Sequence, residues 1–116
     1  MTTRQLDRSQ WQPYFDDINH RLEATQVDLE VSGHDLGVQT EAYDITLIGL
    51  SYDPRDDAFS IVTEELEHRV VHPKQISVRE DADGLTALEI IDREEHRHVA
   101  RLRSALRLPS DERPGA

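Results

Sequence analysis

The chain shows a single helical stripe near its start, followed by a long region in which apolar and polar residues alternate. The apolar residues of the stripe recur at spacings of four, three and four, which places them on one face of a helix: Trp11, Phe15, Ile18 and Leu22. We place this helix at about residues 10–24, with Ser9 and Gln12 as a capping box at its start. An amphipathic helix of this kind needs another element to cover its apolar face.

Beyond the helix, the two-residue alternation is typical of strands with one buried face. The segments with strand character are residues 27–31, 38–42, 45–52, 59–63, 70–71, 76–78 and 85–91. Turn-forming residues separate several of them at residues 33–37, 53–57 and 81–84, and Gly49 marks a bulge or bend. Short strands joined by tight turns predict an antiparallel meander.

The final segment, residues 94–108, fits two structures. Its alternating leucines and arginines suit a strand, whereas its content of helix-forming residues suits a helix. A closing hairpin with the strand at residues 85–91 favours the strand. We expect one domain over residues 1–108 and a disordered tail over residues 109–116.

The order of these elements predicts an α+β fold. One N-terminal helix packs on a curled antiparallel sheet of six or seven strands. The order is similar to that of SH3-like and Sm-like small barrels, which suggests a curled sheet but carries no function by itself.

Acidic residues outnumber basic residues by 24 to 13 in the 116-residue chain, so its formal net charge is −11. Such a charge repels nucleic acids and anionic membranes, and we expect neither as a partner. The absence of cysteine excludes disulfides and thiolate chemistry. Because no apolar run fits a membrane span or a secretory signal, we expect a cytoplasmic protein.

Several short motifs resemble those of a bacterial family of small proteins, the domain of unknown function 5335. The motifs are Trp11 to Asp16, Gly33 to Gly37, Leu47 to Asp53, Pro73 with Ile76, and Ala87 to Ile90. The resemblance covers about residues 4–105. It implies no activity, cofactor or site residue, because the family has none assigned. Members of this family often carry a glycine in the final hairpin turn, where this chain has Asp92-Arg93-Glu94-Glu95.

Four of the six histidines form two pairs with strand spacing. His96 and His98 share a face of one strand, with Glu94 beside them, and His68 and His72 share a face of another. If these strands were neighbours, four imidazoles and a carboxylate could bind a divalent ion such as zinc or nickel. The alternative is a solvated surface, which is the commoner use of histidines set among arginine and glutamate.

The end of the chain is basic, because residues 97–116 carry five arginines against two carboxylates. On a strand, four of these arginines project to one face as a basic stripe: Arg97, Arg101, Arg103 and Arg107. The stripe could contact an anion, RNA or the acidic surface of another chain. Alternatively, it could pair with carboxylates on neighbouring strands, such as Glu89.

No nucleophile elbow, phosphate-binding glycine loop or desolvated carboxylate indicates catalysis, so we expect neither catalytic residues nor a cofactor. Our leading interpretation is a non-enzymatic protein-interaction or scaffold module that forms a homodimer. Its strand edges and basic stripe would make the contacts. The alternatives are a histidine-based metal-binding protein or metal-dependent enzyme, and an RNA-binding small barrel. The net charge of −11 disfavours the second alternative.

Overall fold

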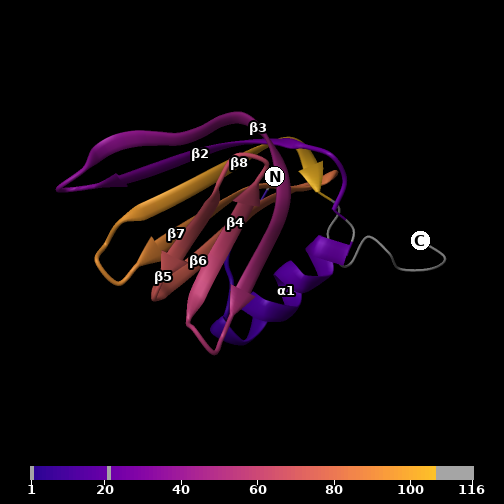
Figure 1. The fold of residues 1–116 in the computed structure, drawn as a ribbon. Coiled ribbons are helices and arrows are strands. Elements are labelled where there is room, and N and C mark those ends of the chain that lie inside the picture. The colour runs from indigo at the N-terminus through magenta and orange to yellow at the C-terminus, as the bar shows by residue number, and fades with distance from the viewer. Residues whose placement is uncertain (1, 21, 107–116) are drawn as a thin grey trace.

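The structure is a computed structural model that describes residues 2–20 and 22–106. Its elements are β1 (Thr2–Gln5), α1 (Arg8–His20), β2 (Gln26–Gly33), β3 (Gly37–Asp53), β4 (Ala58–Thr63), β5 (Glu67–Val71), β6 (Pro73–Asp81), β7 (Gly84–Asp92) and β8 (Arg97–Leu106). The strands pair antiparallel in the order β1-β6-β7-β8-β2-β3-β4-β5. In Figure 1 the β2–β3 hairpin extends away from the end of the sheet that carries α1.

α1 begins earlier than the sequence indicates because Asp7 caps it. The Asp7 N–H donates to Gln10 Oε1 at 3.1 Å, and the Gln10 N–H donates to the Asp7 carbonyl at 2.8 Å. A side chain at the third helical position that reaches back to the cap is a feature of the capping box. The placement of that box at Ser9 and Gln12 is therefore wrong, and Leu22 lies beyond the helix.

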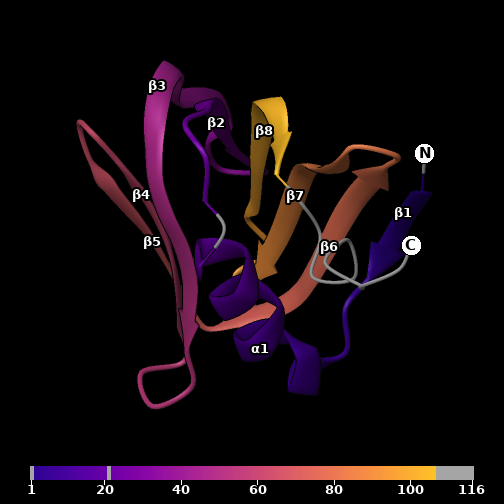
Figure 2. The same cartoon turned by 90° about the vertical axis from the view of Figure 1, so that its right-hand side faces the viewer.

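The apolar face of α1 is buried against the sheet. Its buried residues are Trp11, Tyr14, Phe15 and Ile18. Phe15 packs edge-to-face on Phe59 of β4, with 4.7 Å between the ring centroids, and Trp11 packs on Tyr52 of β3 at 5.1 Å. Figure 2 shows α1 between β3 on one side and β6 on the other. The prediction that the helix covers the sheet is confirmed.

β3 is 17 residues long and changes its partner along its length. It pairs with β2 up to Thr46 and with β4 from Leu47. Register shifts interrupt both pairings. The first surrounds Asp44, which has a φ of 55° and whose N–H donates to Asp28 Oδ1 at 2.8 Å; the second confirms the bulge at Gly49. Because bulges bend strands, β4 and β5 turn back over the core, and β5 contacts β7.

The α+β class is confirmed, but the strand count is wrong because the described residues form eight strands. The missed strand is β1, whose residues are all polar and exposed and which pairs with β6. The sheet is open, with β1 and β5 at its edges, so it is neither strongly curled nor closed into an SH3-like or Sm-like barrel.

The ambiguous C-terminal segment is a strand, β8, as the closing hairpin with β7 indicated. The tail predicted at residues 109–116 lies outside the described residues. In the part of the chain that the structure describes, no helix has the length and apolar character needed to span a membrane.

Candidate functional site

β8 presents different polar side chains to the two faces of the sheet. Its alternation places His98 on the buried face and Arg97 and Arg101 on the exposed outer face. The buried side chain belongs to a hydrogen-bonded set that we call the histidine–aspartate network, made of Asp35, His68, Asp92, His96 and His98. The exposed side chains line a hollow that we call the outer groove.

Asp92, the last residue of β7, is the centre of the network and is only 8% exposed. Its Oδ2 accepts a hydrogen bond from His98 Nε2 at 2.9 Å, and its Oδ1 accepts from the backbone N–H groups of Glu94 and His96. Burial acts to raise the pKa of Asp92, but these hydrogen bonds, with that from His98 first, lower it below its usual value. The ionised carboxylate therefore fixes both the β7–β8 turn and the His98 ring.

His98 links Asp92 to β5. Because an ionised carboxylate only accepts hydrogen bonds, His98 carries a proton on Nε2, and its Nδ1 lies 2.9 Å from His68 Nε2. Burial lowers the pKa of His68, and the nearby His98 lowers it further, while Glu41 of β3 acts in the opposite direction. One hydrogen bond between two imidazoles thus joins β5 to β8, although β2, β3 and β4 lie between them in the sheet order.

His96 links the network to the turn between β2 and β3. Its Nε2 lies 2.9 Å from Asp35 Oδ1, and its Nδ1 lies 3.6 Å from Asp92 Oδ2. The Asp35 hydrogen bond raises the pKa of His96, and the same bond lowers the pKa of Asp35. The ring packs directly on Gly33, where an added Cβ would lie 2.6 Å from His96 Cδ2. Only glycine leaves room for the ring at this position.

The four histidines considered as metal ligands are not gathered around one point. His68 and His98 direct ring nitrogens at each other, His96 binds Asp35, and His72 Nδ1 lies 3.2 Å from Asp57 Oδ2. Among residues 2–20 and 22–106, no three histidine or acidic side chains are arranged to hold a metal ion. The interpretation as a shared metal site is corrected, because these ring nitrogens are engaged with one another and with carboxylates.

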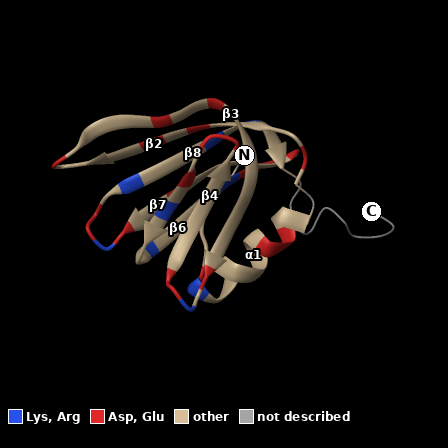
Figure 3. Cartoon of the chain, in the orientation of Figure 1, with Lys and Arg blue, Asp and Glu red and all other residues tan. Residues whose placement is uncertain are grey.

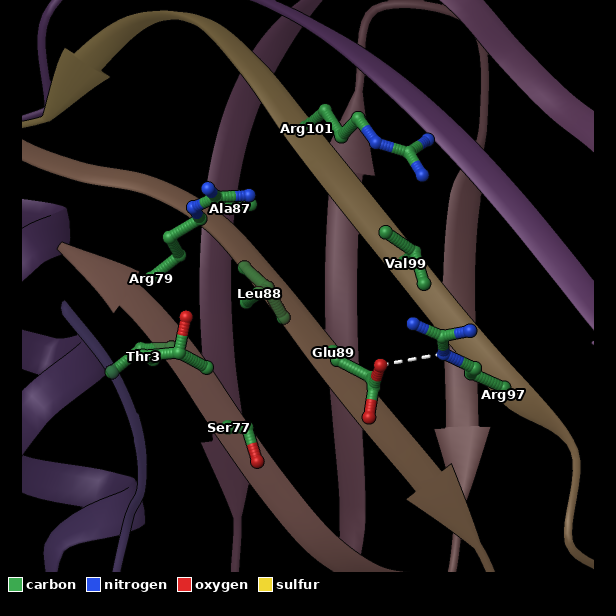
Figure 4. Close-up of a pocket in the computed structure, with 10 residues that line it drawn as sticks. Thr3, Ser77, Arg79, Ala87, Leu88, Glu89, Arg97, Val99 and Arg101 are labelled. Atoms are coloured by element: carbon green, nitrogen blue, oxygen red, sulfur yellow. Dashed lines mark hydrogen bonds and ion pairs between the residues drawn. The ribbon is translucent and has the colours of Figure 1, made fainter. Parts of the chain in front are cut away.

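The outer groove is a hollow of about 270 Å³ on the exposed face of β6, β7 and β8. It is lined by Thr3, Ser77, Val78, Arg79, Ala87, Leu88, Glu89, Arg97, Val99 and Arg101. Figure 4 shows Arg79 near Ala87, Arg97 joined to Glu89, and Arg101 extending from β8 away from Leu88. The lining holds three arginines and one glutamate; Arg97 pairs with that glutamate, and Arg101 pairs with Glu30 of β2 outside the groove.

The basic stripe is formed on β8 as far as the structure describes it, and Arg107 lies outside the described residues. Each of its other arginines donates to a carboxylate on a neighbouring strand: Arg97 to Glu89 at 2.5 Å, Arg103 to Asp28 at 2.9 Å, and Arg101 to Glu30. Figure 3 shows this basic strand beside acidic positions of β2. Glu89 is the cross-strand partner that the sequence indicated. Contact of the stripe with another molecule stays a prediction.

Sequence reasoning missed the two carboxylates of the network. Asp35 lies in a hairpin turn and Asp92 at the strand end before one, where acidic residues are common for local reasons. For Asp92 a signal existed, because a hairpin turn without glycine needs a side chain to bind its free N–H groups. The small residues that hollow the groove, such as Ser77 and Ala87, carried no comparable signal.

Comparison of the chain with known proteins shows its family. The family model described as "Family of unknown function (DUF5335)" matches residues 2–111. The chain belongs to this family. An "Uncharacterized protein" of Aquifex aeolicus (strain VF5) is 40% identical over 110 residues, which cover 94% of this chain and 99% of the relative. No solved structure matches the chain. The resemblance seen in the sequence is confirmed, and membership of the DUF5335 family assigns no activity.

Proposed function

We propose that this DUF5335 protein is a non-enzymatic protein-interaction module that binds an acidic segment of a partner protein in the outer groove. The observation that carries the proposal is the composition of the groove, in which three arginines surround one glutamate. Guanidinium groups bind carboxylates with charge-assisted hydrogen bonds, which are the strongest polar contacts available to a surface of this kind.

The charge distribution favours a short acidic ligand over a nucleic acid. The body of the protein is strongly acidic, with a net charge of −11, and repels any polyanion that extends beyond the groove. At physiological ionic strength, interactions between exposed charges are screened beyond about 8 Å. A short segment inside the groove therefore interacts mainly with the arginines that line it.

The shape of the groove favours a protein segment over an enclosed small molecule. Its volume of about 270 Å³ lies just below the range of typical small-molecule pockets, about 300–1,000 Å³. Arg97 and Arg101 are four residues apart on β8, which corresponds to about 13 Å along a strand. An extended acidic segment with carboxylates at a similar spacing would pair with both arginines.

The existing ion pairs of these arginines do not block such a ligand. Arg97 uses Nε to bind Glu89, and a guanidinium carries further N–H donors that can bind a second carboxylate. Arg97 and Arg101 are both more than half exposed at their side chains, at 57% and 56%. Exposed ion pairs of this kind contribute only about 0–1 kcal/mol, so a ligand can share or replace them at low cost.

A binding assay with a matched peptide pair tests this proposal. A labelled peptide of about 12 residues rich in Glu and Asp would be long enough to follow the groove. Its Gln and Asn counterpart provides the uncharged control in fluorescence anisotropy. We expect the acidic peptide to bind, and we expect its affinity to fall as salt is added. The double variant R97Q/R101Q should lose about tenfold or more in affinity, whereas R55Q, which changes an exposed arginine outside the groove, should not.

Three results would decide against the proposal. Equal binding by the wild type and by R97Q/R101Q would remove the groove as the site. The same affinity for the Glu/Asp peptide and its Gln/Asn counterpart would remove the charge argument. Tighter binding of a single-stranded RNA oligonucleotide than of the peptide would favour the RNA-binding alternative.

We also propose that the chain forms a homodimer, because a second copy is itself an acidic protein and can offer carboxylates to the groove. Sedimentation or mass measurement in solution tests this part separately. A monomer at every practical concentration would remove the homodimer and leave the binding of a different acidic partner to the peptide assay.

A further inference from the structure

The contact between His68 and His98 brings together two strands that the sheet order keeps apart. β5 is an edge strand that pairs only with β4 among the described strands, and β8 lies in the middle of the sheet. Side chains on β5 reach the rest of the molecule in three ways. Val70 is buried in the core, Arg69 forms an exposed ion pair with Asp56, and His68 is hydrogen-bonded to His98.

This hydrogen bond sets a limit on the number of protons that the two rings can hold. Imidazole nitrogens 2.9 Å apart need one N–H donor and one bare nitrogen acceptor. When both rings are neutral, His68 Nε2–H donates to His98 Nδ1. When His98 alone is protonated, its Nδ1–H donates to a neutral His68. When both rings are protonated, two N–H groups and two positive charges face each other, and the contact cannot persist.

Asp92 fixes the orientation of the His98 ring. Its buried Oδ2 accepts from His98 Nε2, so Nδ1 is the ring nitrogen that faces His68. The contact with the edge strand therefore depends on how many protons the two facing nitrogens of His68 and His98 carry together.

We propose that the His68–His98 contact is a proton-sensitive clasp that fastens β5 to β8 near neutral pH and releases β5 under mildly acidic conditions. The release is local, because Val70 and the hydrogen bonds to β4 still hold the strand. The proposal does not depend on the outer groove, which lies on the opposite face of β8.

The charged groups around the clasp have opposing effects on the pKa of His68. Glu41 of β3 favours a protonated His68, while burial and a charged His98 oppose it. His96 Nδ1 lies 3.6 Å from the same Asp92 oxygen, and the hydrogen bond with Asp35 raises the pKa of His96, so a charge on His96 also acts on that carboxylate. The balance keeps the pKa of His68 below its ordinary value of about 6.5, which sets the window below that pH.

The sign of the pH effect follows from proton linkage. The closed clasp binds fewer protons at His68 than the open state does, because the pKa of His68 is lowered only in the closed state. Acidification through the window between the two pKa values therefore favours the open state. One linked proton gives at most about a tenfold increase in the open population per pH unit.

Amide hydrogen exchange of β5, corrected for the intrinsic pH dependence of exchange, tests the clasp at about pH 7.5 and about pH 5. In the wild type we expect β5 amides to lose protection at the lower pH relative to the amides of β7. In H68Q, a glutamine N–H donor can still reach His98 Nδ1 but does not titrate, so β5 protection should stay constant. The matched control is H20Q, because His20 lies at the end of α1 and should leave the acid response unchanged.

Nitrogen NMR of the histidine rings supplies a second test that needs no variant. We expect the protonation of His68 to coincide with the loss of β5 protection. The clasp is refuted if β5 protection in the wild type is unchanged between the two pH values, if H68Q responds as the wild type does, or if His68 takes up its proton without a change in β5 protection.

Discussion

Glu95 holds a backbone conformation that favours glycine, and its replacement gives a sharp test of the β7–β8 turn. Its φ is 69°, in the left-handed region, and its side chain forms an exposed ion pair with Lys74. We therefore expect E95G to be more stable than the wild type.

The expected change in unfolding free energy for E95G is the sum of one stabilising and two destabilising contributions. A left-handed conformation costs a non-glycine residue about 1–2 kcal/mol, which E95G relieves. The greater freedom of glycine in the unfolded chain takes back about 0.5–1 kcal/mol. The ion pair with Lys74 contributes at most about 1 kcal/mol, because both side chains are about half exposed. The net gain in unfolding free energy is about 0.5 kcal/mol, or roughly 2–3 °C in Tm.

Urea unfolding of three variants separates these contributions. E95A removes the ion pair but keeps Cβ, so the difference between E95G and E95A reports the relieved backbone strain less the entropy cost of glycine, and we expect about 0.5–1 kcal/mol in favour of glycine. The matched control is E94G, since Glu94 is exposed and does not have a positive φ; it should lose about 0.5–1 kcal/mol. If E95G and E94G change stability in the same direction, the strain argument is wrong.

Three further predictions concern other contacts. G33A places a Cβ where His96 packs, so the Asp35 hydrogen bond should be lost and the pKa of His96 should fall, as an NMR titration would show. Y14F removes the 2.6 Å hydrogen bond to Glu80 and should cost about 1–2 kcal/mol in urea unfolding; retention of full stability would contradict the contact. Because its pKa is lowered on folding, Asp92 stabilises the protein above about pH 4 and loses this effect at lower pH. D92N should therefore flatten the acid limb of the stability curve, and an unchanged limb would exclude Asp92 as its source.

The helix was predictable from the sequence, but its start was not. Ser9 with Gln12 and Asp7 with Gln10 are equally good capping signals by spacing. The choice between them depends on Leu6, which is buried and donates its N–H to the carbonyl of Ile76 on β6. That tertiary contact fixes the direction of the chain before the helix, and no local pattern records it.

The strands show the same division between local and long-range causes. β2, β4 and β7 have strong alternation and were predicted, because one face of each is buried by this chain's own core. β1 has no apolar residue and exists as a strand because β6 offers a free edge and Glu80 offers a partner for Arg4. The barrel was expected from the order of the elements. That order does not determine whether the two edge strands of the sheet, β1 and β5, pair with each other and close it.

The histidines and arginines of the candidate site were predictable from the sequence, but the carboxylates of the network and the assembly of the site were not. The histidine pairs and the arginine stripe were visible as patterns, whereas their partners come from strands distant in the chain. Asp92 reaches His98 within one hairpin, but His68 is 30 residues away from His98 in the sequence. Bulges in β3 turn β5 toward β8 and make that contact, and register shifts of this kind leave only a weak trace in the sequence.

The side chains on the two faces of β8 differ in whether they can change hydrogen-bond partners, and this difference makes the two proposals independent. Arg97 and Arg101 form exposed ion pairs, which a new carboxylate can share or replace at little cost. His98 and Asp92 are buried, so neither can change partner without leaving an unpaired polar group in the core, and the pair can respond only by gaining or losing protons. R97Q/R101Q should therefore alter peptide binding and leave the acid response of β5 intact. H68Q should abolish the acid response and leave peptide binding intact. If either variant changed both properties, the outer groove and the clasp would be one coupled device, and the independence of the two faces would be refuted.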